Sequence, residues 1–373
     1  MEKNYKIEVS PAIVGPEALK NVFLELQKNI NNSELSIQKF QDSLSISTGS
    51  EYVIAVSSGT AALHLALVVL GVGEGDEIIC PTFTFVATAS PILYLGAKPV
   101  FVDSETETLN MSPDLLEEAI ISGISRGKKP KAAVVVHNYG MPAKIYEILE
   151  ICNKYEITLI EDAASALGSR FQDRHLGTFG ELGIISFNYN KIITTTAGGA
   201  ILTANKDFAH KIFYFSSHSK EALPYYEHHQ VGFNYKMSGM CAELGNQQMQ
   251  DLKSRLEIKR KIFNHYEQTL NKINGCRLVI EPANCFSNRW ITTIFFQEEA
   301  IQKEIKKNLE EEFIETRYLW NPMHRQPVFS SYLNFLNGNS DHFFKTGLCL
   351  PSGISLNKKD QDRIITLILN YFN

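Results

Sequence analysis

The sequence predicts an α/β fold with a large, mostly parallel seven-stranded sheet, helices on both of its faces and a smaller C-terminal α/β domain. Two observations support this prediction. Residues 50–205 contain short runs that are continuously apolar, as strands covered on both faces should be. Segments of helical periodicity lie between several of these runs, and alternating strands and helices are typical of a parallel sheet.

The expected strands of the large sheet follow one another in the first half of the chain, at residues 52–57, 77–81, 99–103, 131–137, 157–162, 182–187 and 199–203. Helical periodicity is clearest at residues 60–71 and 144–155. After residue 205 the alternation is less strict, with helical patterns at 240–273, 301–313 and 358–372 and a strand-like run at 289–296. We therefore expect a large domain over residues 1–250, which includes an N-terminal arm, and a small domain over residues 251–373.

Composition narrows the class of protein. The 36 Lys and Arg residues against 41 Asp and Glu give a net charge of −5, too mild to favour nucleic acid as the main partner. No apolar run reaches the roughly 18 residues that a membrane span requires, and the first twenty residues lack a signal-peptide pattern. The six cysteines are scattered and expected to be reduced, and no cluster has metal-ligand spacing. We expect a cytoplasmic protein without metal or membrane insertion.

Candidate functional residues follow the predicted strands, because ligands of an open parallel sheet bind at the carboxyl ends of its strands. Ser58, Gly59 and Thr60 follow the first strand and begin a helix, whose N–H groups attract an anion. A plain helix cap is an equally good interpretation of these residues alone. Phe85 follows the second strand and could stack on a planar ring, although a single aromatic is more often part of the core.

Asp162 and Lys191 are the two candidates with a charged side chain. Asp162 ends a buried strand, where an ionised carboxylate needs a cationic partner, although a helix cap or an ion pair with Arg would also explain it. Lys191 lies just beyond another strand, and a desolvated lysine has a lowered pKa and can attack a carbonyl. An anion cradle, an aromatic ring, a buried carboxylate and a reactive lysine together fit pyridoxal 5′-phosphate (PLP), whose ring nitrogen needs an Asp partner.

Over nearly its whole length the chain resembles the DegT/DnrJ/EryC1/StrS family of sugar aminotransferases, which are PLP enzymes of the aspartate-aminotransferase fold (fold type I). The matching stretches occur in the family's order and spacing, and include "SSGTAALHLAL", "EDAASALGS", "GTFGELGIISFNYNKIITTTAGGA" and "VGFNYKMSGMCAELGNQQ". Further stretches are most similar to the branch that makes UDP-4-amino-4,6-dideoxy-N-acetylglucosamine in the bacillosamine pathway, namely "RGKKPKAAVVVHNYGMPAK", "NRWITT" and "ETRYLWNPMHRQPVF".

The resemblance implies a role for each matching residue. Lys191 would form the Schiff base with PLP, and Asp162 would contact the ring nitrogen. The remaining cofactor contacts would come from Ser58, Gly59, Thr60, Phe85, Ser165 and Ser186. Asn234 would reach the phosphate of the neighbouring subunit's cofactor, which implies a homodimer with shared active sites. Four residues lie where relatives contact the nucleotide sugar: Arg317, Trp320, Asn321 and His324.

The implied reaction transfers an amino group from glutamate to C4 of a nucleotide-linked 4-keto-6-deoxy sugar, with the cofactor alternating between PLP and its aminated form, PMP. A UDP-linked N-acetylglucosamine derivative is expected, and GDP- and dTDP-linked sugars are alternatives. Related PMP-dependent sugar dehydratases carry His in place of the lysine, and a non-catalytic sugar-nucleotide-binding homologue would be expected to lose Lys191 or Asp162. No GxGxxG follows the first strand, which argues against a dinucleotide-binding oxidoreductase.

Overall fold

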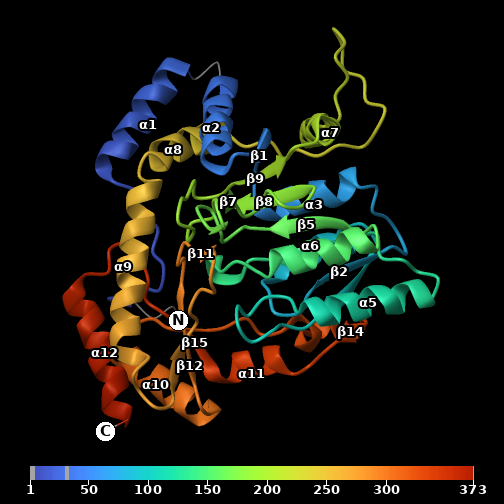
Figure 1. The fold of residues 1–373 in the computed structure, drawn as a ribbon. Coiled ribbons are helices and arrows are strands. Elements are labelled where there is room, and N and C mark those ends of the chain that lie inside the picture. The colour runs from blue at the N-terminus through green and yellow to red at the C-terminus, as the bar shows by residue number, and fades with distance from the viewer. Residues whose placement is uncertain (1–4, 30–32, 373) are drawn as a thin grey trace.

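The large sheet contains all of the predicted strands and one more. The computed structural model describes residues 5–29 and 33–372. The predicted strands are β1 (Tyr52–Val56), β2 (Glu77–Pro81), β3 (Lys98–Val102), β4 (Ala132–Val136), β5 (Thr158–Asp162), β8 (Leu182–Ser186) and β9 (Gly199–Thr203). The eighth, β14 (Asn334–Phe335), completes the order β1-β9-β8-β5-β4-β2-β3-β14 (Figure 1). The expectation of seven strands was wrong because this short strand comes from far downstream in the chain.

Strand direction places most carboxyl ends at one edge of this sheet. The strands from β8 to β14 in the sheet order are parallel to one another. Strand β9 runs antiparallel to both of its neighbours, β8 and β1. Strand β1 therefore points the same way as β8, and the segments that follow every strand except β9 emerge at the same edge.

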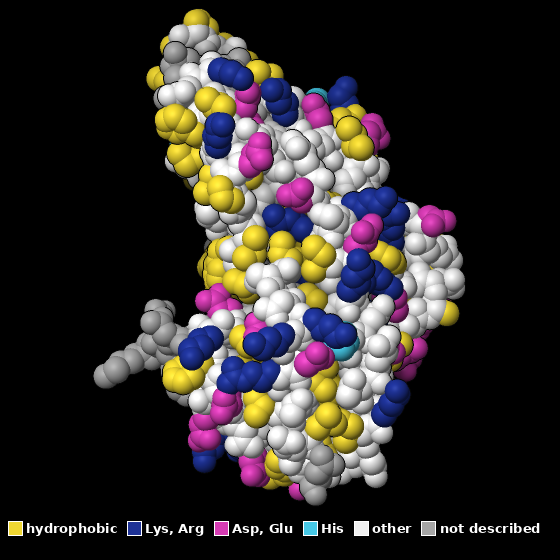
Figure 2. All heavy atoms as spheres, turned by 90° about the vertical axis from the view of Figure 1, so that its left-hand side faces the viewer, with side chains coloured by type: hydrophobic (Ala, Val, Ile, Leu, Met, Phe, Trp, Pro, Cys, Tyr) yellow, Lys and Arg dark blue, Asp and Glu magenta, His cyan; other side chains and the backbone are white. Residues whose placement is uncertain are grey.

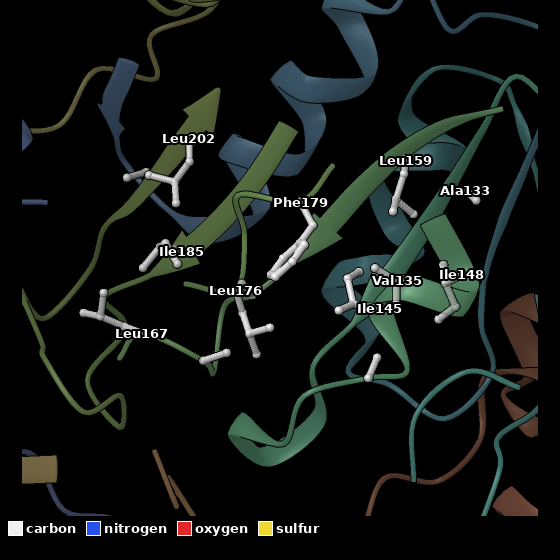
Figure 3. Close-up of a cluster of buried hydrophobic side chains, with 14 of the residues drawn as sticks. Ala133, Val135, Ile145, Ile148, Leu159, Leu167, Leu176, Phe179, Ile185 and Leu202 are labelled. Carbon is white, nitrogen blue, oxygen red and sulfur yellow. The ribbon is translucent and has the colours of Figure 1, made fainter. Parts of the chain in front are cut away.

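Helices cover both faces of the large sheet, and alternate strand residues face the two layers. In β4, Ala133 and Val135 pack into one core while Ala132 and Val134 pack into the other. Figure 3 shows the first of these cores, where β4 lies beside Ile145 and Ile148 of the covering helix. This layer is formed by α2 (Ser33–Thr48), α5 (Pro113–Ser125), α6 (Ile145–Lys154) and α8 (Gly239–Met249). The opposite layer is formed by α3 (Gly59–Val69), α4 (Ser90–Tyr94) and α7 (Lys206–Ser216).

A second sheet lies in the C-terminal part and has its own hydrophobic core. Its strands are antiparallel, in the order β10 (Cys276–Leu278), β12 (Thr292–Phe296), β15 (Gly347–Leu350) and β13 (Arg317–Tyr318). Three helices supply the rest of this core: α9 (Leu252–Leu270), α10 (Glu299–Glu311) and α12 (Lys358–Phe372). The helical pattern expected at 240–273 is thus two helices, α8 and α9, with Gln250 and Asp251 between them.

The remaining elements connect these bodies. A three-stranded sheet contains β11 (Cys285–Phe286), β6 (Arg170–Phe171) and β7 (Arg174–His175). Helix α1 (Pro16–Asn29) packs against α8, and α11 (Asn339–Thr346) packs against α10. Short 3-10 turns occur at η1 (Val86–Thr88), η2 (Asn138–Gly140), η3 (Met323–Arg325) and η4 (Pro327–Phe329).

Two segments cross the domain boundary predicted near residue 250. Strand β14 pairs with β3, and Met323 and Phe329 pack into the same core as α3. At the other end of the chain, Ile7 packs into the core of the second sheet and bridges to Ile314. The division at residue 250 remains a prediction, and these contacts tie the two bodies together on both sides of it.

Surface charge is mixed in sign. Figure 2 shows the side of the molecule on which basic, acidic and hydrophobic side chains are interspersed. Together with the net charge of −5, this face offers no extended field of one sign for a polyanion. Within residues 5–29 and 33–372, no helix has the length and apolar character needed to cross a bilayer.

Candidate active site

A cavity of about 290 Å³ lies at the carboxyl ends of the parallel strands. The segments after β1, β2, β4, β5 and β8 all contribute to its wall, as expected for an open parallel sheet. Nine of the predicted site residues line it: Ser58, Gly59, Thr60, Phe85, Asp162, Ser165, Ser186, Lys191 and Trp320. A larger hollow of about 1420 Å³, between α1, α2, α8 and α9, contains none of the predicted site residues.

The amine of Lys191 is held inside this cavity. Its Nζ donates a hydrogen bond to Ser165 Oγ at 2.7 Å and lies 3.9 Å from the ring centroid of Trp290. Burial lowers the pKa of Lys191 to about 8, against the charge of Asp162, which acts to raise it. A lysine with this pKa is partly deprotonated near neutral pH, so that it can act as a nucleophile and as a proton carrier.

Asp162 points its carboxylate into the same cavity from the end of β5. The residue is 8% exposed. Its Oδ2 accepts a hydrogen bond from Thr88 Oγ1 at 2.8 Å, and its Oδ1 accepts one from the N–H of Ala164 at 3.2 Å. These donors fix the orientation of the carboxylate, which can then hold a protonated ring nitrogen.

Glu161, the neighbour of Asp162, does not line the cavity. Its carboxylate is fully buried, pairs with His137 Nε2 at 3.0 Å and accepts backbone hydrogen bonds from the turn formed by residues 177–180. Burial would raise the pKa of Glu161, but the hydrogen bond and charge of His137 and the N–H groups of Gly180 and Gly177 outweigh it and lower the pKa. Glu161 is therefore a structural group, whereas Asp162, the carboxylate singled out from the sequence, faces the cavity.

The start of α3 forms the candidate anion site. Ser58 is the N-cap of α3 and accepts a hydrogen bond from the N–H of Ala61 at 3.0 Å, so the cap interpretation of its side chain is confirmed. A Cβ atom added to Gly59 would lie 3.1 Å from Cβ of Ser186, at the end of β8. The glycine thus lets the helix start approach the strand end closely, where Thr60 and the Ser186 hydroxyl also line the cavity.

Aromatic side chains form one wall of the cavity. Phe85 is 55% exposed, so its interpretation as a core residue was wrong. Its ring centroid lies 5.4 Å from that of Trp320, and Trp320 stacks on Tyr139 at 5.6 Å with an interplanar angle of 9°. The ring centroid of Tyr139 lies 6.5 Å from that of Trp290. Phe85, Trp290 and Trp320 line the cavity and offer ring faces against which a flat ligand can pack.

The other predicted substrate residues do not line the cavity. Both ring nitrogens of His324 have partners, Thr82 Oγ1 at 2.8 Å and Asp341 Oδ2 at 3.3 Å. Arg317 pairs with Glu315 at 2.6 Å. Two more residues lie outside the lining: Asn321, whose buried Oδ1 has no hydrogen-bond partner among the described residues, and Asn234, which is exposed. Their roles in substrate or cofactor binding remain predictions.

Sequence reasoning missed several residues that line the cavity, and three of them lie beside Lys191 or Asp162. Trp290 covers the Lys191 amine, Thr88 orients Asp162, and Asn190 lies in the cavity wall beside the lysine. Trp290 is about a hundred positions from Lys191, and no local pattern links the two residues. Thr88 could have been suspected from its place in the segment after β2, which also supplies Phe85.

Comparison with known proteins agrees with this geometry. The model of the DegT/DnrJ/EryC1/StrS aminotransferase family matches residues 16–369. EpsN of Bacillus subtilis (strain 168), whose name assigns it to the pyridoxal-phosphate-dependent aminotransferases, is 41% identical over 341 residues, 90% of this chain and 88% of that protein. The GDP-perosamine synthase of Escherichia coli O157:H7 is 35% identical over 294 residues, 79% of each protein.

One solved structure of this family has the same fold as the chain. The crystal structure of a DegT DnrJ EryC1 StrS aminotransferase from Brucella abortus matches with a TM-score of 0.90 and 27% identity, and the match covers 96% of each chain. The match includes both sheets, since it extends over nearly the whole chain. With the family model, the relatives and this structure in agreement, the chain belongs to the DegT/DnrJ/EryC1/StrS aminotransferase family.

Proposed function

We propose that this enzyme transfers an amino group from glutamate to C4 of UDP-4-keto-6-deoxy-N-acetylglucosamine, in the biosynthesis of a surface glycan. One observation supports the proposal above all others: a buried amine, a fixed carboxylate and a helix N-terminus meet in one cavity, at Lys191, Asp162 and α3. Membership of an aminotransferase family supports the reaction type. The choice of a UDP-linked sugar comes from the resemblance of the sequence to the bacillosamine branch.

The donor set of the cavity fits PLP. The N-terminus of α3 with Gly59, Thr60 and Ser186 would hold the phosphate, since a helix N-terminus attracts anions. Asp162 would hold the ring nitrogen, and Phe85 is exposed to the cavity for stacking. When bound, PLP supplies a carbonyl for amines and a ring that withdraws electrons from the reacting carbon.

The chain's own residues then have distinct tasks. Asp162 would hold the protonated ring nitrogen, with its carboxylate oriented by Thr88 and the N–H of Ala164. Lys191 accepts and donates a proton at its Nζ, and its pKa of about 8 suits both directions near neutral pH. Ser165 holds this amine through its hydroxyl, while Trp320 and Phe85 restrict water.

The enzyme is proposed to act as a homodimer in the cytoplasm. Asn234 is exposed at the base of a loop that projects beside α7, so it is free to contact a neighbouring subunit rather than its own cavity (Figure 1). All six cysteines are free, which is consistent with a reducing compartment.

A GDP-linked 4-keto-6-deoxy sugar is the second candidate acceptor. The observation in its favour is the identity of 35% to the GDP-perosamine synthase of E. coli O157:H7, over 79% of the chain. The two candidates differ in nucleotide and in the substituent at C2 of the sugar, so a direct comparison separates them.

Incubation of the purified protein with PLP, glutamate and each of the UDP-, GDP- and dTDP-linked 4-keto-6-deoxy sugars tests both candidates by product mass. We expect amination of the UDP-linked N-acetylglucosamine derivative, with the highest kcat/KM of the panel. A preference for the GDP-linked sugar would select the second candidate. Amination of none of them would contradict the proposed reaction, provided that the Lys191→Ala variant serves as the blank and PLP binding is verified by absorbance.

A further inference from the structure

Trp290 contacts the amine of Lys191 although it belongs to the other body of the molecule. It lies two residues before β12 of the second sheet and is 2% exposed. The Nζ atom of Lys191 is 3.9 Å from its ring centroid and 2.7 Å from Ser165 Oγ. The amine is therefore held between a ring face and a hydroxyl oxygen, and both contacts favour the ammonium form.

The same indole also fixes the backbone beside Lys191. Trp290 Nε1 donates a hydrogen bond of 2.7 Å to the carbonyl of Asn190, the residue that precedes the lysine. Ser10 Oγ donates to the same carbonyl at 2.9 Å. One side chain thus holds both ends of Lys191, its amine through the ring face and its backbone through the indole N–H. Any buried indole N–H needs an acceptor, but a tryptophan that only filled the core would not need an amine against its ring face.

Trp290 is itself held from three directions. The backbone N–H of Trp290 donates to Asn288 Oδ1 at 2.9 Å. The centroid of its ring lies 6.5 Å from that of Tyr139, with an interplanar angle of 19°. Its carbonyl accepts a hydrogen bond of 2.8 Å from Lys259, a buried lysine of α9. The indole therefore has little freedom to turn away from the amine, as expected of a group whose task is to fix another side chain.

We propose that Trp290 is a positioning residue for Lys191, whose ring face keeps the free amine beside Ser165 and within reach of the reacting atoms. The inference rests on the proposed role of Lys191 as the proton carrier. Because Trp290 belongs to the second body of the molecule, that body takes part in the chemistry in this proposal. Asp162 is the charged group that acts on the amine from the sheet side, and Trp290 acts from the opposite body.

The proposal is tested by the pH profile of Lys191 in the full-length chain freed of PLP. Trace labelling with acetic anhydride, followed by mass spectrometry of the Lys191 peptide, gives the midpoint of its titration. Trp290→Phe keeps an aromatic face beside the amine. Trp290→Leu leaves a cavity similar in size to that in Trp290→Phe but offers no aromatic face. We expect the midpoint to be about 0.5 to 1 pH unit lower in the Leu variant than in the Phe variant.

Phe343→Leu is the matched control, because Phe343 packs in the same hydrophobic cluster as Trp290 but does not line the cavity. Its profile should match that of the wild-type protein. Coincident profiles of the Phe and Leu variants would overturn the proposal, as would an equal shift in the control. If Trp290→Leu does not fold, the titration midpoint of Lys191 in Trp290→Phe must still lie below that of the wild-type protein, because the phenyl face binds a cation more weakly than indole.

A second measurement uses the PLP-loaded enzyme with glutamate as the amino donor. We expect Trp290→Leu to lower kcat by about tenfold or more while KM for glutamate stays nearly constant, as for a group that acts on a catalytic side chain. A rise in KM with unchanged kcat would contradict the proposal. Because labelling requires no turnover, it gives an answer even if every sugar acceptor fails, so failure of the proposed reaction and failure of this inference are distinguishable.

Discussion

Glu161 and Asp162 are adjacent in the sequence but lie on opposite faces of β5, and of the two only Asp162 lines the cavity. Glu161 is enclosed by His137 and the turn at residues 177–180, whereas Asp162 meets Thr88 at the cavity wall. The alternation of side chains along a strand explains this division. Two carboxylates that look equivalent in the motif "EDAAS" should therefore give opposite phenotypes.

Asp162→Asn should abolish most activity without loss of the fold. The amide keeps the shape of the side chain and can still accept the hydrogen bond from Thr88, but it cannot stabilise a positive charge on a ring nitrogen. We expect kcat for amination to fall by about 100-fold or more, which is the range for loss of a catalytic acid–base group. Steady-state kinetics and a thermal unfolding curve measured together check this, and wild-type kcat would contradict it.

Glu161→Gln should unfold more easily and retain its chemistry once folded. One amide oxygen cannot satisfy both His137 and the N–H groups of the 177–180 turn, and the amide N–H₂ would face donors. The expected loss of unfolding free energy is about 1–3 kcal/mol, as for buried hydrogen-bonding groups left without a partner. Because the pKa of Glu161 is lowered in the folded state, this stability is present above the ordinary pKa and is lost as pH falls. Urea unfolding at several acid pH values should show a weaker pH dependence in Glu161→Gln.

Lys191 should be the residue that borohydride links to the cofactor. The described chain has two lysines whose pKa is lowered by burial of the amine, Lys191 to about 8 and Lys259 to about 7, but only Lys191 lines the cavity. Reduction of the PLP-loaded protein, followed by digestion and mass spectrometry, should place the modification on the Lys191 peptide. Lys259→Met should give the same adduct, and an adduct in Lys191→Ala would refute the assignment.

Local patterns in the sequence were sufficient to predict the strands and the residues that directly follow them. Ser58, Asp162 and Lys191 each come just after an apolar run, and the parallel topology brings the ends of those runs to one edge. Strand β14 could not be predicted because it is short and is stabilised by pairing with β3 rather than by its own pattern. Trp290 could not be predicted because its contact with Lys191 depends on how two sheets pack.

In the segment from Arg317 to His324, side chains of one motif point in different directions. Trp320 lines the cavity, but His324 bonds Thr82 and Asp341 and thereby attaches its loop to the end of β2. A motif fixes the order of residues, whereas the direction of each side chain depends on partners elsewhere in the chain. These two contacts hold His324 in its loop, and its role in substrate binding remains a prediction.

Gly59→Ala should weaken cofactor binding more than it weakens the fold. The added Cβ would lie 3.1 Å from Cβ and 3.3 Å from Oγ of Ser186, so the helix start must move away from the strand end. We expect the Kd for PLP, measured by absorbance titration, to rise by about tenfold, which corresponds to roughly 1.4 kcal/mol. Gly73→Ala is the control, because a Cβ there meets nothing within 4 Å. An equal rise of the Kd for PLP in both variants would show that the close approach of Gly59 to Ser186 is not the cause of the weaker binding.

Lys259 should make the cofactor-free protein more stable as pH rises. Burial, aided by the charge of Arg255, lowers the pKa of Lys259 from 10.5 to about 7. Between these values the unfolded chain binds more protons than the folded one, so the free energy of unfolding increases with pH, by up to about 1.4 kcal/mol per unit. Lys191 adds a slope of the same sign above pH 8.

Urea unfolding of the cofactor-free protein between pH 7 and pH 9 measures this slope. Lys259→Met should lower it clearly, leaving the part due to Lys191. Lys253→Met is the control for the loss of one lysine, because Lys253 lies on the same helix and is exposed. If the free energy of unfolding has the same pH slope in Lys259→Met and in the wild-type protein, Lys259 is not the buried titrating group. Its hydrogen bond to the Trp290 carbonyl then does not persist in solution.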